Sequence, residues 1–303
     1  MRLTLRQLQI FVAIAQSGST TAAGEKIALS QSAISASIAE LERSLNVQLF
    51  ARVGKRLLLN DHGRAMLPQA MALLNSAESL EQSYLKDSPS LLIIGASLTI
   101  GNYLLPSLLA NYWRRQGIDL GDSTPPLQVV VANTADIASK VANFEVDIGL
   151  VEGPCYRPEI TVMPWLQDEL LLVAAPSHAI VQEYGTSLIP FERLAKANWL
   201  LREQGSGTRD ALEHAILPHV NQLKSSLEFN DHEAIKQSSA QGLGIACLSR
   251  LVVADMLDAG KLVELNTTAG KFGRRFSLLV HLQKQITPGM QQFITHATGI
   301  KGY

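Results

Sequence analysis

Hydrophobic residues in the first 60 positions recur at helical spacing and predict three short helices around a small core. The stripe of the first helix consists of Leu5, Leu8, Phe11 and Ala15, and that of the third consists of Ile34, Ile38, Leu41 and Leu45. Ser19 is a suitable N-cap for a second helix that runs to about Ile27, and Ser30 is a suitable N-cap for the third. The pattern therefore predicts two helices joined by a tight turn, with a further helix before them.

The opposite face of the third helix begins with polar side chains that have no charge. Ser30 at the cap is followed by Gln31, Ser32 and Ser35. Short hydrogen-bonding side chains in the first turns of a helix are typical of a recognition helix that contacts base edges in a major groove. The alternative interpretation is an ordinary polar helix surface.

A short hairpin is predicted for residues 49–59, with a glycine and three cations at or near its tip. The cations are Arg52, Lys55 and Arg56, which suit contacts with phosphates. Residues 1–60 contain seven Lys plus Arg against three Asp plus Glu, a net charge of +4. Because the whole chain has a net charge of −1, the remainder has −5. This asymmetry indicates a nucleic-acid-binding head on an acidic body.

The residues of this segment also form an ordered motif. Its members are Leu8, Phe11, Ser19, Ala23, Ile27, the run Ser30-Gln31-Ser32-Ala33-Ile34-Ser35, Ile38, Leu41, Glu42 and the run Leu49-Phe50-Ala51-Arg52. The motif resembles the N-terminal signature of the LysR-type transcriptional regulators. Two positions depart from it, because Gly24 stands where the family usually has alanine and Asn60 where it usually has threonine. A glycine inside a helix costs about 1 kcal/mol relative to alanine, so we expect a looser second helix.

A long helix is predicted from Asp61 to about Asp87, with Asn60 or Asp61 as its cap. Apolar residues spaced four, three, four, three and four apart form a coiled-coil seam, which implies a partner helix. They are Met66, Ala70, Leu73, Ala77, Leu80 and Tyr84. Pro68 predicts a bend. The seam favours self-association, with packing on the body of the same chain as the alternative. In the resembled family this helix dimerises, the working form is a homotetramer, and RNA polymerase is a further partner.

After position 88 the pattern changes to short apolar runs alternating with helices, which predicts an α/β fold with a mostly parallel sheet. The predicted strands of the first sheet are Leu91–Ala96, Leu127–Ala132 and Val146–Val151, those of a second sheet are Leu170–Ala175, Trp199–Leu201, Ser225–Phe229 and Ile245–Leu248, and Phe276–His281 returns to the first. Two lobes crossed by two strands leave a cleft. The predicted organisation is a winged helix-turn-helix domain (1–60), a linker helix (61–88) and an effector domain (89–303), with lobe I at about 89–163 and 268–303 and lobe II at about 164–267.

Three hydroxyl-rich turns between a strand and a helix are candidates for binding an anion, because helix N-termini present free N–H groups. They contain Ser97 and Thr99, expected on one side of an extended segment, then Asn133 and Thr134, and finally Gly205, Ser206 and Thr208. Plain helix caps are the alternative interpretation of these hydroxyls. Glu203 would repel an anion at the third turn unless it points away or pairs with Arg202 or Arg209.

The segment from Leu91 to about Ile300 resembles the periplasmic-binding-protein-like effector domain of the LysR family. In that family inducers lie between the lobes, near positions matching Ser97, Thr99, Thr134 and Ser206. The runs GASLTIGNYLLP, GSGTR and EAIKQSSAQGLGIACLS are similar to the branch that includes regulators of carbon fixation and of sulfite reduction. The resemblance implies double-stranded DNA as a partner and a small anionic effector such as sulfite, sulfate, or a small carboxylate or phosphate.

Little in the sequence supports an enzymatic function. Gly205-Ser206-Gly207 lacks the GxSxG spacing, and no lysine completes a P-loop after it. His214 and His219 are five apart and do not share a helical face, and the two cysteines lie far apart outside any CxxC pattern. We therefore expect no catalytic residues, no metal, no cofactor, no membrane span and a cytoplasmic protein whose histidines are solvated or satisfied in the core. The alternative is a two-lobed solute-binding protein or enzyme whose N-terminal helices only dimerise.

Overall fold

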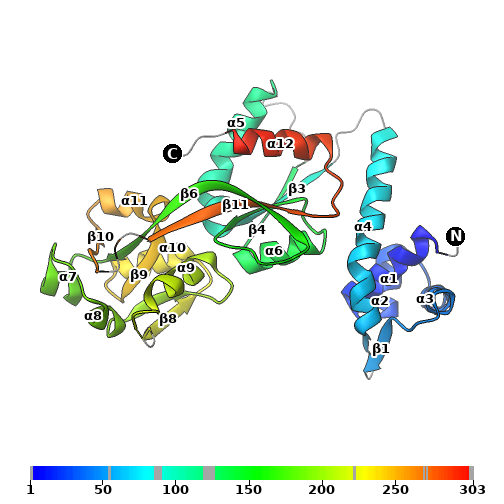
Figure 1. The fold of residues 1–303 in the computed structure, drawn as a ribbon, viewed down its shortest axis with the longest axis horizontal. Coiled ribbons are helices and arrows are strands. Elements are labelled where there is room, and N and C mark those ends of the chain that lie inside the picture. The colour runs from blue at the N-terminus through cyan, green and yellow to red at the C-terminus, as the bar shows by residue number, and fades with distance from the viewer. Residues whose placement is uncertain are drawn as a thin grey trace. The chain divides into compact units, whose positions relative to one another are not determined.

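The computed structural model describes residues 3–53, 56–84, 91–118, 127–220, 223–268, 270 and 272–299. The chain divides into two compact units, one formed mainly by residues up to 88 and the other mainly by residues from 89 onward. We call them the N-terminal unit and the C-terminal unit. Figure 1 shows both as ribbons.

The N-terminal unit contains the three predicted helices, a hairpin and a long helix. Its elements are α1 (Leu5–Ser17), α2 (Thr20–Ile27), α3 (Gln31–Leu45), β1 (Phe50–Val53), β2 (Arg56–Leu59) and α4 (Asp61–Tyr84). Ser19 and Ser30 cap α2 and α3 as predicted, accepting from the N–H groups of Ala22 and Ala33. Most of the predicted stripe residues are buried, but Leu5 and Leu45 are 47% and 38% exposed. The prediction was wrong for these two because each lies at a helix end that extends past the core.

The structure explains why a glycine occupies position 24, which the sequence alone did not. A Cβ atom at this position would lie 2.6 Å from the carbonyl oxygen of Leu29. Leu29 also donates its N–H to the carbonyl of Gly24 at 2.9 Å, which closes the turn between α2 and α3. The glycine therefore allows the close approach that this turn requires, which offsets its low helix propensity.

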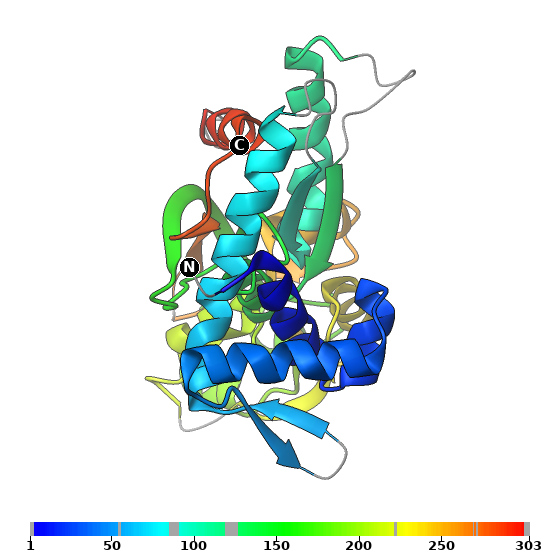
Figure 2. The same cartoon turned by 90° about the vertical axis from the view of Figure 1, so that its right-hand side faces the viewer.

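Hydrogen bonds join the hairpin to the helices on both sides of it. Glu42 Oε1 in α3 accepts from the N–H groups of Leu49 at 2.7 Å and Phe50 at 3.3 Å. Asn60 caps α4 by accepting from Gly63 N–H at 2.9 Å, and its amide nitrogen donates to the carbonyl of Gln48 at 2.8 Å. Figure 2 shows the hairpin projecting below α3. The expected cation Lys55 lies outside the described residues.

Packing on the same chain, the alternative interpretation of the seam, is confirmed for the first part of α4, and self-association stays a prediction. Met66 packs against the core of the N-terminal unit, and Ala70 is buried within it. Further along the seam Leu73 is 53% exposed. The first turns of α4 therefore belong to the core of their own unit, and the exposed part of the seam starts after them.

The C-terminal unit is built on one hydrogen-bonded path of strands in the order β4-β3-β5-β11-β6-β9-β7-β8. The strands are β3 (Leu92–Ser97), β4 (Leu127–Ala132), β5 (Ile148–Glu152), β6 (Ile160–Ala174), β7 (Trp199–Arg202), β8 (Ser225–Phe229), β9 (Ile245–Ser249), β10 (Val263–Glu264) and β11 (Phe272–His281). The expectation of two separate sheets was wrong, because β6 is 15 residues long and pairs with strands of both lobes.

Helices cover this sheet and define the two lobes. They are a π-helix (Ile100–Leu104), α5 (Leu105–Arg115), α6 (Thr134–Ala142), α7 (Ala179–Tyr184), α8 (Phe191–Ala195), α9 (Gly207–Ile216), α10 (His232–Ala240), α11 (Arg250–Asp258) and α12 (Pro288–Thr298). Lobe I contains the parallel strands β4, β3 and β5, and lobe II contains β8, β7 and β9, also parallel. The antiparallel strands β6 and β11 cross between them (Figure 1). The predicted two-lobed α/β fold is confirmed.

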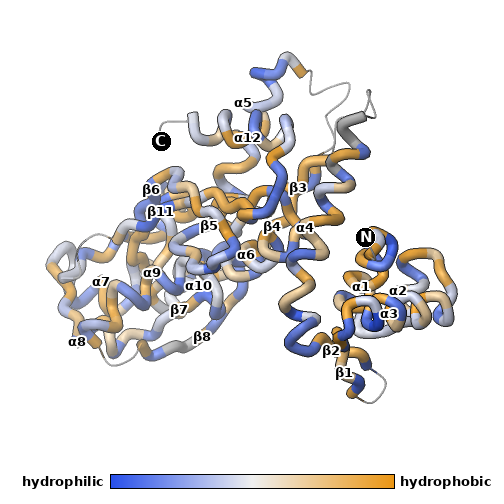
Figure 3. Tube along the Cα trace, turned by 45° about the vertical axis from the view of Figure 1, so that its right-hand side comes forward, coloured by the Kyte–Doolittle hydropathy of each residue, from blue (hydrophilic) through white to orange (hydrophobic). Residues whose placement is uncertain are grey.

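Each lobe has its own hydrophobic core. Lobe I buries Ile94, Ile148 and Leu150, and the mostly orange tube of β3 and β5 in Figure 3 follows these hydrophobic runs. Lobe II buries Trp199, whose indole N–H donates to the carbonyl of Leu194 at 2.9 Å. The strand β4 was expected to be buried, but Val129 and Val131 are exposed because β4 lies at the sheet edge.

No helix within the described residues combines the length and apolar character needed to cross a membrane. In the same part of the chain, His, Cys, Asp and Glu side chains form no group of three that could hold a metal ion.

Candidate functional site

The two lobes meet where the N-terminus of α9 contacts the end of β5. A Cβ atom on Gly207 would lie 2.2 Å from the carbonyl oxygen of Glu152, and one on Gly205 would lie 2.9 Å from Cβ of Ala135. The N–H of Ala135 donates to the carbonyl of Gly205 at 3.1 Å, across the lobes. The two glycines are therefore needed for close approach of the lobes, and Gly205 also has a φ of +86° that favours glycine.

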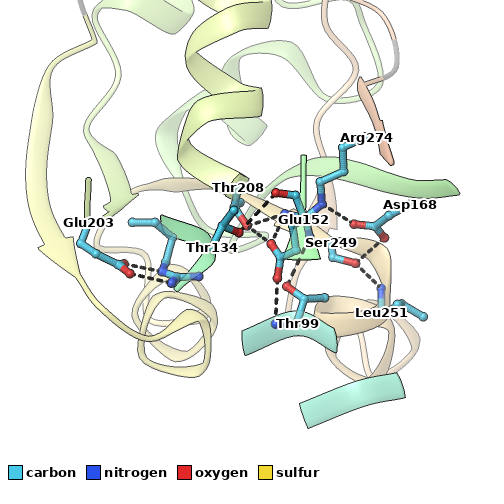
Figure 4. A network of polar contacts seen from close by, with 10 residues as sticks. Thr99, Thr134, Glu152, Asp168, Glu203, Thr208, Ser249, Leu251 and Arg274 are labelled. Atoms are coloured by element: carbon cyan, nitrogen blue, oxygen red, sulfur yellow. Dashed lines mark hydrogen bonds and ion pairs between the residues drawn. The ribbon is translucent and has the colours of Figure 1, made fainter. Parts of the chain in front are cut away.

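Glu152 lies at the centre of a buried polar network at this junction. Its Oε1 accepts from Thr99 N–H at 3.0 Å, and its Oε2 accepts from the Thr208 hydroxyl at 3.2 Å and pairs with Arg274. Arg274 Nε donates to Asp168 Oδ2 at 2.6 Å, while the Ser249 hydroxyl donates to Asp168 Oδ1 at 2.6 Å. Figure 4 shows this network, with Arg274 placed between the two carboxylates.

Burial and ion pairing act in opposite directions on these groups. Burial raises the pKa of Glu152. The Arg274 guanidinium and the hydroxyls of Thr99 and Ser97 together lower this pKa by more than burial raises it, so the net shift is downward. For Asp168 burial prevails, and its pKa is raised despite Arg274 and Ser249. Glu152 is therefore held ionised, and one guanidinium is shared between two buried carboxyl groups.

Three buried polar atoms around Glu152 have no hydrogen-bond partner among the described residues. They are Ser97 Oγ, Ser206 Oγ and His232 Nδ1, each on a side chain that is 1% exposed. The Ser97 hydroxyl lies near the Glu152 carboxylate and lowers its pKa, but the two groups do not meet the geometry of a hydrogen bond. Ser206 precedes Gly207, which touches Glu152. Burial and the neighbouring Arg202 lower the pKa of His232, while Glu152 raises it. Because unpartnered buried polar atoms are costly, this group is a candidate for a ligand site.

The other predicted ligand residues have partners within the protein. The prediction of an extended segment was wrong for Thr99, which has helical backbone angles after Ser97 ends β3. Thr134 donates its hydroxyl to the carbonyl of Glu152 at 3.2 Å, and Asn133 Oδ1 accepts from Asp136 N–H at 2.9 Å as a cap of α6. For Asn133 the structure therefore favours the plain cap.

Glu203 pairs with Arg202, which fulfils the condition that the sequence set for an anion site at the third turn. Arg202 Nε and its terminal nitrogen donate to the two oxygens of Glu203 at 2.8 and 2.9 Å. Arg209 instead bonds to Glu213 at 2.7 Å. The acidic side chain beside Ser206 is thus paired, and the Arg202 guanidinium is occupied.

Sequence reasoning missed Glu152, Asp168, Arg274 and His232. Glu152 directly follows the buried run Ile148–Val151, and a carboxylate at the end of an apolar strand is a usable signal. Arg274 and Asp168 interrupted apolar runs and were placed outside the predicted strands. His232 was expected to be solvated or satisfied, but its Nδ1 is buried and unpartnered.

In the N-terminal unit, polar side chains form a surface at the start of α3. Gln31 and Ser32 are exposed, and the Gln31 amide nitrogen donates to the hydroxyls of Ser35 at 2.9 Å and Thr20 at 3.3 Å. Ser30 is occupied as the cap. The exposed cations Arg52 and Arg56 lie on the hairpin strands. Thr20 was not predicted as part of this surface.

A winged helix-turn-helix joined to a two-lobed α/β unit with a polar junction defines the class of DNA-binding regulators that respond to a ligand. The description "Bacterial regulatory helix-turn-helix protein, lysR family" matches residues 5–64, and "LysR substrate binding domain" matches residues 87–299. The chain belongs to the LysR family of transcriptional regulators, and it is not an enzyme.

Three similar proteins place the chain within this family. The chain is 43% identical to "Uncharacterized HTH-type transcriptional regulator YeiE" of Escherichia coli K12, over 98% of this chain and 97% of that protein. It is 29% identical to the "RuBisCO operon transcriptional regulator" of Allochromatium vinosum, over 97% and 95%. The Synechocystis PCC6803 CcmR regulatory domain in complex with 2-PG is 26% identical, with a TM-score of 0.61, over 70% of this chain and 99% of that one. The predicted resemblance to the branch that includes regulators of carbon fixation and of sulfite reduction is confirmed.

Proposed function

We propose that this transcriptional regulator senses a small anion bound at the lobe junction, next to Ser97, Ser206 and His232. The observation that supports the proposal most strongly is the set of three buried, unpartnered polar atoms on these side chains. They come from β3, from the residue before α9 and from α10, so that both lobes contribute. The similar CcmR regulatory domain in complex with 2-PG supports a small-molecule ligand.

The chemistry of the junction suits an anion that is bound mainly by neutral donors. Ser206 stands at the N-cap of α9, yet its side chain makes no cap hydrogen bond. The first N–H groups of α9 and the partial positive charge of the helix N-terminus then favour an anion beside Ser206. Serine hydroxyls rotate to donate to whichever oxygen is presented. Sulfite, sulfate, and small carboxylates or phosphates are the proposed effectors.

The effector would act on the balance between lobe arrangements. Contacts across the lobes include the Thr208 hydroxyl with Glu152 at 3.2 Å and the Tyr103 hydroxyl with Glu233 Oε2 at 3.2 Å. A ligand that binds one arrangement better shifts the population toward it, by no more than its difference in affinity. We propose that this shift changes the spacing or angle of the DNA-binding heads.

For DNA, we propose that Gln31, Ser32 and Ser35 contact bases and that Arg52, Lys55 and Arg56 contact phosphates. The exposed Leu73 on α4 supports pairing of α4 helices in a dimer or tetramer. A tetramer, RNA polymerase as a further partner and a cytoplasmic location are proposals that rest on the family.

Replacing Ser97 or Ser206 with alanine should weaken anion binding roughly 10- to 150-fold, because each hydroxyl is expected to make one hydrogen bond to a charged group worth about 1.5–3 kcal/mol. The measurement is the thermal stability of the full-length chain against concentrations of sulfite, sulfate, phosphate and small carboxylates, since a specific ligand stabilises the folded state by mass action.

Ser139→Ala is the matched control, because the Ser139 hydroxyl on α6 donates to the carbonyl of Ala135 and lies outside the proposed site. This control should respond to each anion as the unsubstituted protein does. If no anion in the panel stabilises the full-length chain, or if Ser97→Ala and Ser206→Ala leave the response as unchanged as the control does, the proposed function is wrong.

A further inference from the structure

The carboxylate of Glu152 lies among the same donors that the sequence assigned to a ligand. Thr99 N–H and the Thr208 hydroxyl both donate to it, and the Ser97 hydroxyl lies close by. Its side chain is 2% exposed. An anion held by Ser97 and Ser206 therefore meets a buried, ionised carboxylate that has no hydrogen to donate.

The arginines of the site do not cancel the repulsion between this carboxylate and an incoming anion, because they are already paired. Arg274 is shared between Glu152 and Asp168, and Arg202 is bound to Glu203 through two hydrogen bonds. When both carboxyl groups around Arg274 are ionised, this cluster has a net charge of −1. A fully ionised anion would then place its lone pairs against those of Glu152, which is unfavourable in a buried site.

His232 complements the serines as a donor. The Asn102 amide nitrogen lies 3.5 Å from His232 Nε2, and when this amide donates, the proton of the neutral ring is on the unpartnered Nδ1. Burial and Arg202 lower the pKa of His232, which keeps the ring neutral at pH 7. The junction thus offers three neutral donors and one carboxylate acceptor.

We propose that Glu152 is a specificity residue which selects an oxyanion that retains a proton on one oxygen and rejects a fully ionised one. This inference rests on the proposed function. The protonated oxygen donates to Glu152, while the ionised oxygens accept from Ser97, Ser206, His232 and the first turn of α9. A site built to accept a hydrogen bond rejects an analogue that lacks the hydrogen by large factors. The effector class is then the hydrogen-bearing oxyanions, such as hydrogenphosphate, a singly ionised phosphate monoester or hydrogensulfite.

Inorganic phosphate and sulfate test this preference because both are tetrahedral, yet only phosphate keeps a proton between pH 6 and pH 8. Calorimetric titration of the full-length protein should give an affinity for phosphate at least about 100-fold above that for sulfate. Sulfite should bind more tightly as the pH falls across this range, because its protonated form increases. The groups that face Glu152 are Arg274, Asp168 and His232, and a parallel titration with sulfate separates their protonation from that of the ligand.

Glu152→Gln supplies an amide donor in place of the acceptor and should reduce the preference for phosphate to within about threefold, mainly by improving sulfate binding. Asp168→Asn is the matched control, because it removes the other carboxylate bonded to Arg274 and should leave the preference unchanged. If Glu152→Gln does not fold, the comparison of phosphate with sulfate binding in the unsubstituted protein still tests the inference.

Two results would overturn the inference while leaving the proposed function intact. One is equal binding of sulfate and phosphate by the unsubstituted protein. The other is a loss of preference in Asp168→Asn as large as that in Glu152→Gln. If neither phosphate, sulfite nor sulfate binds, this inference fails, and the proposed function fails with it only when the small carboxylates of the panel do not bind either.

Discussion

Replacing Arg274 with methionine is expected to lower the free energy of unfolding of the C-terminal unit by roughly 3–5 kcal/mol, since removing one partner of a buried ion pair leaves an uncompensated charge. The loss of stability should lie near the upper end of this range because Glu152 and Asp168 both lose their cation. The measurement is urea denaturation followed by tryptophan fluorescence. Trp113, Trp165 and Trp199 are the three tryptophans of the chain and all lie in this unit.

The loss should shrink as the pH falls from 7 toward 5. In the unsubstituted protein the pKa of Glu152 is below its ordinary 4.5, so its stabilising contribution is fully present throughout this range and is lost only below pH 4.5. Without Arg274, burial raises the pKa of Glu152, and the folded state then binds its proton more tightly than the unfolded state. Acidification therefore stabilises the variant relative to the unsubstituted protein.

A triple variant that combines Arg274→Met with Glu152→Gln and Asp168→Asn is the control, because replacing a whole buried ion cluster by uncharged groups is often close to neutral. It should recover much of the lost stability. If Arg274→Met alone costs less than about 1 kcal/mol, the guanidinium does not shield two buried carboxylates, and our interpretation of the junction is wrong.

Replacing Gln31 with alanine is expected to cost about 1–3 kcal/mol of binding to the specific site and little on random DNA, which relaxes specificity. The physical reason is that the exposed Gln31 amide, oriented by Ser35 and Thr20, is proposed to contact a base edge. Fluorescence anisotropy with a specific and a scrambled duplex, over a series of salt concentrations, measures both effects.

Arg56→Ala is the contrasting variant, because an exposed cation on the hairpin is proposed to contact phosphate. It should weaken binding to both duplexes alike and reduce the slope of log affinity against log salt by about one. Equal losses on specific and scrambled DNA for Gln31→Ala would remove Gln31 from the base-contacting residues.

The sequence predicted the local elements well where a single apolar pattern was uninterrupted. Ser19 and Ser30 define α2 and α3, and β4 and β8 have the predicted bounds. The pattern failed for β6, whose first ten residues include Pro164, Gln167, Asp168 and Glu169. A strand that crosses between lobes can hold polar residues because partners from other elements satisfy them, and no local pattern contains that information.

The candidate site was predictable only in part, for a related reason. Ser97 and Ser206 were predictable from a local pattern, because Ser and Thr are common in turns between the end of a strand and the start of a helix. The partners Glu152 and Arg274 are 122 positions apart, and Arg274 and Asp168 are 106 apart. Only the folded chain brings these charges together. The glycines beside Ser206 fitted an anion-binding turn from sequence, whereas the structure shows that they permit contact between the lobes.

We propose that the N-terminal unit binds a specific duplex and that the C-terminal unit controls this binding through a small anion. The most direct measurement is the affinity of the full-length protein for a duplex selected from a randomised pool, against its scrambled counterpart, with and without phosphate or sulfite at moderate salt. We predict a preference of about 1,000-fold or more for the selected duplex, together with a change in affinity when a binding anion is added. Equal affinity for both duplexes under all of these conditions would contradict the account.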